Sequence, residues 1–162
     1  MTVTIRLLDP QQVAEAKHLI LSIAARTLEP DSTFEAFVER HGHGLVDVDD
    51  YRAQYSAPAG RFLVVMDDER LVGTAAIRRV DDSTAELRRL WLLEAYHGQG
   101  IGYRLTRQLL DFARAAGYRR VRLTTDAGQD RALRLYRGLG FTFIEAYGQE
   151  KNGLFMELTL EA

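Results

Sequence analysis

The sequence predicts one mixed α/β domain over residues 1–162, with about seven strands in a central mixed sheet and four to five helices packed on it. Two local patterns support this fold class: short β-rich runs bounded by turn residues, and longer segments in which apolar residues recur every three to four positions. The chain has 46% hydrophobic and 27% charged residues, as expected for one globular domain of this length. It contains no cysteine, which excludes disulfides, thiolate metal sites and an acyl-cysteine intermediate.

The first 60 residues predict one strand followed by helices. We expect a strand over 2–8 and a helix start at Asp9-Pro10-Gln11-Gln12, where an N-cap Asp, a Pro at the first helical position and a Gln after them coincide. Apolar residues near the 3.6-residue period extend this helix to Glu29-Pro30. A second capping box, Ser32-Thr33-Phe34-Glu35, opens another helix, and the acidic run 47–50 predicts the cap of a short third one.

The composition changes at residue 61, where β-rich runs begin. Residues 61–66 and 71–80 have the pattern of an antiparallel hairpin around the charged turn 67–70, and 85–93 is a third strand. Two further helices, each stopped by Gly, and three further strands complete the chain. In order these are a helix over 101–116, a strand over 118–125, a helix over 129–139, and strands over 141–147 and 154–160.

A Gly-rich segment, His97-Gly98-Gln99-Gly100-Ile101-Gly102, joins a predicted strand to a predicted helix. Unpaired N–H groups at a helix N-terminus bind phosphate, and glycines let a pyrophosphate approach them. A dinucleotide fingerprint is excluded because Tyr103 stands where its last Gly is needed, and a Walker loop is excluded because no Lys lies between Lys17 and Lys151. A Gly-rich turn without a ligand remains the structural alternative.

Positive charge is concentrated close to this segment. The formal net charge is −2, yet residues 101–140 hold nine arginines and three acidic residues. The planar guanidinium group donates two parallel hydrogen bonds and therefore suits phosphate. A solvated helix face is the alternative, and charge alone leaves both interpretations open.

Two motifs in this order resemble those of the GNAT superfamily of acyl-CoA-dependent N-acyltransferases. The Gly-rich segment is similar to the family turn [Q/R]-x-x-G-x-[G/A], with His97 in place of the first residue. Residues 129–141 are similar to N-x-x-A-x-x-x-Y-x-x-x-G-F, with Gln129 in place of Asn. The positions of this second block that match are Ala132, Tyr136, Gly140 and Phe141. The resemblance covers about residues 60–147.

The resemblance implies a mostly antiparallel twisted sheet in which two parallel strands, 87–93 and 118–125, splay apart to admit acetyl-CoA as cosubstrate. It also implies that strand backbone holds the pantetheine and that the Gly-rich turn holds the pyrophosphate, with Arg104 as an additional phosphate contact. The residues it assigns to the cofactor are Leu90, Trp91, Leu92, His97, Gly98, Gln99, Gly100, Ile101, Gly102, Tyr103, Arg104 and Gln129.

Two residues are candidates for catalysis. An alkylamine of pKa about 10.4 is only about one part in a thousand neutral at pH 7, so a base must accept its proton before attack. Glu86 stands eleven residues before His97, the spacing of a catalytic glutamate in some GNAT enzymes; a surface glutamate is the alternative. The family position of Tyr136 implies a hydrogen bond or proton donated to the departing CoA thiolate, and a core aromatic is the alternative.

The resemblance implies direct transfer of an acetyl group to a primary amine in a ternary complex, without a metal. The acceptor is expected to be a small molecule; a peptide or protein amine, or a non-catalytic acyl-CoA-binding module, are the alternatives. Asp47, Asp49 and Asp50 would suit a cationic acceptor, or cap a helix. We expect no nucleic-acid partner, because the first hundred residues are net negative, and no membrane partner. The longest apolar run is 62–66, so we expect a cytoplasmic protein; a homodimer stays open.

Overall fold

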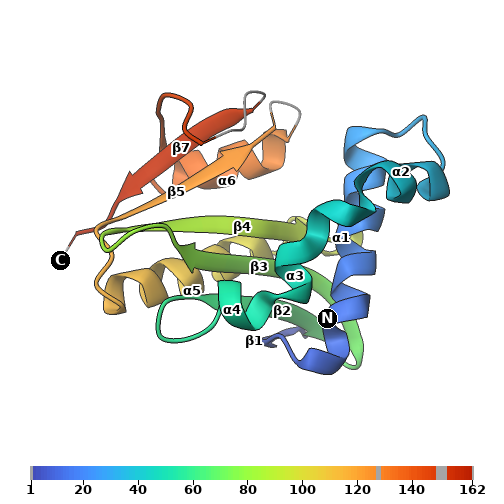
Figure 1. The fold of residues 1–162 in the computed structure, drawn as a ribbon, viewed down its shortest axis with the longest axis horizontal. Coiled ribbons are helices and arrows are strands. Elements are labelled where there is room, and N and C mark those ends of the chain that lie inside the picture. The colour runs from blue at the N-terminus through green and yellow to red at the C-terminus, as the bar shows by residue number, and fades with distance from the viewer. Residues whose placement is uncertain (1, 127–128, 149–152, 162) are drawn as a thin grey trace.

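A computed structural model describes residues 2–126, 129–148 and 153–161 (Figure 1). Its strands are β1 Thr4–Leu7, β2 Arg61–Asp67, β3 Arg70–Arg79, β4 Thr84–Leu92, β5 Arg120–Thr125, β6 Thr142–Phe143 and β7 Leu154–Thr159. They form one seven-stranded sheet in the order β1-β2-β3-β4-β5-β7-β6. Every neighbouring pair is antiparallel except β4 and β5, which are parallel. The predicted mixed, mostly antiparallel sheet is confirmed.

Helices cover both faces of this sheet (Figure 1). The α-helices are α1 Val13–Leu28, α2 Phe34–His41, α3 Val46–Asp49, α4 Tyr51–Gln54, α5 Ile101–Ala115 and α6 Asp130–Gly138. Short 3-10 turns are η1 Pro10–Gln12, η2 Gly42–Leu45 and η3 Glu94–Tyr96. No helix in the described part of the chain combines the length and the apolar composition needed to cross a membrane.

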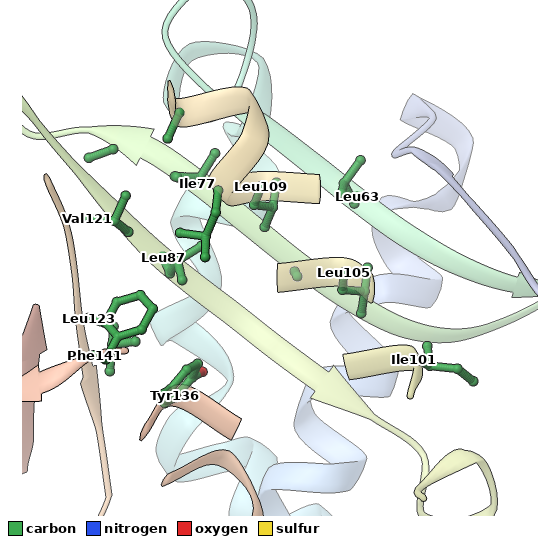
Figure 2. Close-up of a cluster of buried hydrophobic side chains, with 14 of the residues drawn as sticks. Leu63, Ile77, Leu87, Ile101, Leu105, Leu109, Val121, Leu123, Tyr136 and Phe141 are labelled. Carbon is green, nitrogen blue, oxygen red and sulfur yellow. The ribbon is translucent and has the colours of Figure 1, made fainter. Parts of the chain in front are cut away.

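Two hydrophobic clusters follow from the alternation of side chains along the strands. On one face Leu63, Ile77 and Leu87 pack against Leu105 and Leu109 of α5, as Figure 2 shows. On the other face α1, α3 and α4 cover Phe62 and Val64 with buried residues such as Ile20, Val48 and Tyr51. Burial on both faces explains why β2 is apolar almost throughout rather than alternating.

The parallel pair separates after three residues. Thr84, Ala85 and Glu86 of β4 lie opposite Arg120, Val121 and Arg122 of β5, and no pairing continues beyond them. β4 then runs on to Leu92 beside β3, while β5 stays paired with β7 along its whole length. The two strands diverge visibly in Figure 1. The predicted splay of the two parallel strands is therefore confirmed.

Some predicted boundaries differ from the structure. The Asp9 capping box is present, since Asp9 Oδ1 accepts from Gln11 N and Gln12 Oε1 accepts from Asp9 N. The cap of α2 is Thr33 rather than Ser32: Thr33 Oγ1 accepts from Ala36 N at 3.1 Å. The predicted strand 141–147 is only Thr142–Phe143, because β7 provides register partners for these two residues alone. The acidic run 47–50 caps no helix with its side chains.

Candidate active site

The Gly-rich turn presents open backbone at the start of α5. Gly98 and Gly100 have φ of +79° and +78°, in the left-handed region that side chains disfavour. A Cβ at either position would meet no heavy atom within 4 Å beyond the chain neighbours, so ligand can approach this backbone from outside. Gly100 is the N-cap of the 15-residue helix α5, whose first N–H groups have no partner inside the helix. The turn can therefore hold an anion.

A cavity of about 490 Å³, which we call the turn cavity, lies between this turn, the end of β4 and the start of α6. Ten of the twelve predicted cofactor residues line it: Leu90, Trp91, Leu92, His97, Gly98, Gly100, Ile101, Gly102, Tyr103 and Gln129. Gln99 and Arg104 are exposed and are not part of its lining. Sequence reasoning missed the contributions of Ile23 and Thr27 from α1 and of Arg131 from α6.

The side chain of His97 contacts the end of β4. Its Nε2 lies 2.9 Å from the carbonyl oxygen of Leu92, so the ring N–H can donate to the last residue of β4. The neighbouring Tyr96 is buried and its hydroxyl donates to Asp67. Both side chains fix the turn against the sheet.

A second cavity of about 710 Å³, which we call the split cavity, lies where β4 and β5 diverge. Its walls come from residues 86–91 of β4, residues 122–125 of β5, the end of β3, Tyr136 and Tyr147. Leu90, Trp91 and Gln129 line both cavities. The two cavities therefore share a wall at the point where the parallel strands separate.

Tyr136 brings a hydroxyl from α6 to the split cavity. Its ring is buried, with 6% of the residue exposed, and its centroid is 5.6 Å from that of Phe141. In Figure 2 the hydroxyl oxygen is on the side away from Phe141. It has no hydrogen-bond partner among the described residues, and burial raises the pKa of the phenol. The ring of Tyr136 is thus part of the hydrophobic core, and its hydroxyl is part of the cavity wall.

Glu86 lies on the wall of the same cavity, at the last position of β4 that pairs with β5. Its side chain is 14% exposed and Oε1 accepts from Arg78 Nε and NH2 at 3.0 and 2.9 Å. Within the described chain Oε2 has no hydrogen-bond or ion-pair partner. Glu86 is therefore a partly buried carboxylate, not the freely solvated one of the structural alternative.

The acidic run near residue 47 is engaged by basic side chains. Asp47 accepts from Arg89 Nε at 3.0 Å and from the hydroxyl of Tyr55. Burial raises the pKa of Asp47, but the hydrogen bonds from Arg89 and Tyr55 outweigh it and hold the pKa below its ordinary value. Asp49 pairs with Lys17 at 3.0 Å. Both carboxylates are thus neutralised, and no member of the run is among the described residues that line the split cavity.

The profile of the Acetyltransferase (GNAT) family matches residues 26–141. The chain belongs to the GNAT acetyltransferase family. An uncharacterised N-acetyltransferase of Mycobacterium tuberculosis is 33% identical over 126 residues, which are 75% of this chain and 80% of that protein. Human N-acetyltransferase 8B and zebrafish (Danio rerio) N-acetylaspartate synthetase are each 39% identical over about 100 residues, 59% of this GNAT chain. The chain covers only 44% and 34% of the length of these two relatives.

Solved structures agree with this assignment at the level of the fold. A GNAT-family acetyltransferase of Staphylococcus aureus superposes with a TM-score of 0.84 at 18% identity, covering 99% of this chain and all of the other. The PaiA N-acetyltransferase of Thermoplasma acidophilum, solved in complex with coenzyme A, gives 0.79 at 19% identity with the same coverage.

The basic segment 101–140 contributes less to the cavities than its charge indicates. Arg107 and Arg114 pair with Asp111, and Arg137 stacks on Phe143. Of the nine arginines only Arg131 is in the described lining of the turn cavity and only Arg122 in that of the split cavity. Most of the excess positive charge of residues 101–140 therefore lies on solvated helix faces, which was the alternative to a phosphate site.

Proposed function

We propose that this GNAT chain transfers an acetyl group from acetyl-CoA to the primary amine of a small molecule, by direct attack in a ternary complex. The observation that carries the proposal is the shared wall of the two cavities at the split between β4 and β5. One cavity has the backbone for a pyrophosphate, and the other is large enough for an amine. The place where they adjoin is where a thioester and an amine would react.

The turn cavity suits the cosubstrate along its length. The turn at 97–103 and the N-terminus of α5 would bind the pyrophosphate, and Arg131, the one arginine in the described lining of this cavity, would add a charged contact. Because β5 diverges from β4 after Glu86, the edge of β4 beyond this residue is free to pair with the pantetheine amides. The backbone of Leu90, Trp91 and Leu92 would make these hydrogen bonds. The CoA complex of the Thermoplasma PaiA protein and the N-acetyltransferase names of the sequence relatives support this assignment.

The split cavity holds a proton acceptor and a proton donor that the reaction can use. Glu86 accepts a proton from the acceptor ammonium, directly or through a water, and the neutral nitrogen then attacks the thioester carbonyl carbon. The C–N bond forms, the tetrahedral intermediate collapses, and the C–S bond breaks. The leaving thiolate takes a proton from the hydroxyl of Tyr136, and the second proton that the nitrogen loses as the amide forms returns to the Tyr136 oxygen. Since burial raises the pKa of Tyr136, its phenol is protonated at neutral pH and can donate a hydrogen bond to the sulfur as the C–S bond breaks.

Two other functions compete with this one. A non-catalytic acyl-CoA-binding module is disfavoured because Glu86 and Tyr136 line the same cavity. An amine on a peptide or protein is a second candidate. The N-acetylaspartate synthetase named among the relatives supports a small-molecule acceptor instead.

Acetyl-CoA binding is tested by a matched pair of glycine variants. A ligand at 100 times its Kd stabilises a protein by about 2.7 kcal/mol, which for this length raises the Tm by about 5–10 °C. Gly100→Leu should abolish most of that shift, because the side chain occupies the space in front of the turn. Gly117→Leu, with φ of +93° and equally open space beyond the other end of α5, should retain it. Equal CoA-induced shifts in both variants would contradict the proposal.

A further inference from the structure

We propose that the acceptor is an amine that also carries a carboxylate, such as a free amino acid, and that Arg88 and Arg122 bind this carboxylate in the split cavity. This inference rests on the proposed function and names the class of its second substrate. It differs from the cationic acceptor that the acidic run at 47–50 would suit. The reason lies in the charges that surround the cavity.

The described lining of the split cavity is strongly basic. Two acidic residues, Glu86 and Asp126, belong to it. Five arginines face them: Arg78, Arg79, Arg88, Arg89 and Arg122. A second ammonium group on the acceptor, as in a polyamine, would be repelled there, whereas a carboxylate would be attracted.

Three of these arginines have a carboxylate oxygen within 3.0 Å. Arg78 pairs with Glu86, and Arg79 pairs with Asp82 in the adjacent turn. Arg89 takes both oxygens of Asp47. Their charges are balanced within the protein, so they do not require a ligand.

Arg88 and Arg122 account for the excess positive charge of the cavity lining. Arg88 NH1 reaches Asp47 Oδ2 only at 3.5 Å and the hydroxyl of Tyr55 at 3.4 Å, because Arg89 holds the carboxylate more closely. Arg122 stacks on the ring of Tyr147 at 4.0 Å. Its Nε is buried without a hydrogen-bond partner, and it has no ion pair, as far as the described residues extend. A guanidinium held flat against a ring keeps its planar edge available for a carboxylate.

The positions of these two residues relative to Glu86 fit an amine and a carboxylate on one small molecule. Arg88 follows Glu86 by two residues on β4, so both side chains leave the same face of the strand. Arg122 is the register partner of Glu86 across the last pair of the parallel ladder. The proton acceptor is therefore a neighbour of both proposed carboxylate ligands, at the edge of the split where the thioester is expected.

The test compares amino acids with their carboxamides, across glycine, leucine, phenylalanine, aspartate and lysine, and adds putrescine as a dicationic acceptor. CoA-thiol release from acetyl-CoA gives kcat/KM, and the melting temperature of the CoA-loaded protein gives acceptor binding without turnover. We expect the best amino acid to exceed its amide by about tenfold or more, mainly through KM, and putrescine to be the poorest acceptor. We expect this preference for the acid even though the amine of the carboxamide is less basic. Because more of that amine is neutral at a given pH, the chemical step alone would favour the carboxamide.

Arg88→Met and Arg122→Met should each lower the acid-to-amide ratio about tenfold, because only the acid loses a charged partner. Arg107→Met is the matched control, because this arginine pairs with Asp111 on α5 outside the lining of both cavities, and the ratio should not change. If a variant fails to fold, the acid and amide comparison on the unaltered protein still decides.

The outcomes separate the inference from the proposed function. Thiol release with no preference for acids, or with putrescine preferred, overturns the inference and retains the acetyltransferase. Acid-specific thermal stabilisation without thiol release from any amine supports the anionic site and overturns the proposed function. The absence of both signals overturns both.

Discussion

Replacement of Tyr136 by Phe separates its hydroxyl from its ring. The ring packs on Phe141 in the core, and Phe retains that packing. The hydroxyl makes no hydrogen bond to the described residues, so its loss breaks none there and should change the free energy of unfolding by less than about 1 kcal/mol, or about 2–4 °C in Tm. If Tyr136 protonates the leaving thiolate, kcat should fall by about 10²–10⁴, which is about 2.7–5.5 kcal/mol in the barrier.

The assay is steady-state CoA-thiol release at saturating acetyl-CoA and acceptor, with calorimetry to measure the Kd of CoA. We expect kcat to fall while the Kd changes less than about twofold, because the hydroxyl acts on the sulfur only as the thiolate forms. Burial raises the pKa of Tyr136, so the unaltered enzyme should not lose turnover through ionisation of this phenol up to about pH 10. A kcat close to that of the unaltered enzyme would refute the reasoning and leave Tyr136 as a packing residue.

Three further changes test other parts of the structure. Glu86→Gln should depress turnover most near pH 6.5 and recover partly towards pH 9.5, where more acceptor is already neutral; a uniform loss across the pH–rate profile would indicate a positioning role. Asp47→Asn should lower the free energy of unfolding at pH 7 by about 3 kcal/mol in urea titrations, because it breaks a buried ion pair. The folded-state pKa of Asp47 is lowered, so this difference should shrink as the pH falls below about 4; a constant difference would contradict the assignment. Gly73→Ala should lower the free energy of unfolding by about 1–3 kcal/mol in the same titration. The added Cβ would lie 2.8 Å from Leu92 Cδ1 and 3.1 Å from the carbonyl oxygen of Trp91. An unchanged urea midpoint would show that β4 moves to make room for the methyl group at no cost.

Local sequence signals predicted those parts of the site that one segment builds. The turn at 98–102 could be predicted because its glycines, the preceding strand and the following helix are contiguous. The Asp9 cap and the stop at Gly117 rest on equally local chemistry. The splay of β4 and β5 came from the family resemblance, because nothing within either strand indicates where their pairing ends.

Parts of the site built by distant segments could not be predicted in this way. Arg78, Arg88 and Arg122 meet only through the registers of β3, β4 and β5. Asp47 looks like a helix cap in isolation, and its partner Arg89 is 42 residues further along the chain. The spacing of Glu86 and Arg88 was the one sequence signal for this part of the site, because it places both side chains on one face of a strand. This signal could be used only by someone who already knew which strand pairs with β4.

The short parallel ladder also has a mechanical consequence. Strands β1 to β4 form one half-sheet and β5, β7 and β6 another. In the described chain the backbone pairing of β4 with β5, together with the adjoining hydrogen bonds, is limited to residues 83–86 and 119–122. A pantetheine that hydrogen-bonds to β4 would act as a substitute strand at the place where the ladder stops. We therefore expect hydrogen exchange of the amides at 87–92 to slow when CoA binds, together with those of β5 across the gap. Cohesion between the two half-sheets would then depend on occupancy by the cosubstrate.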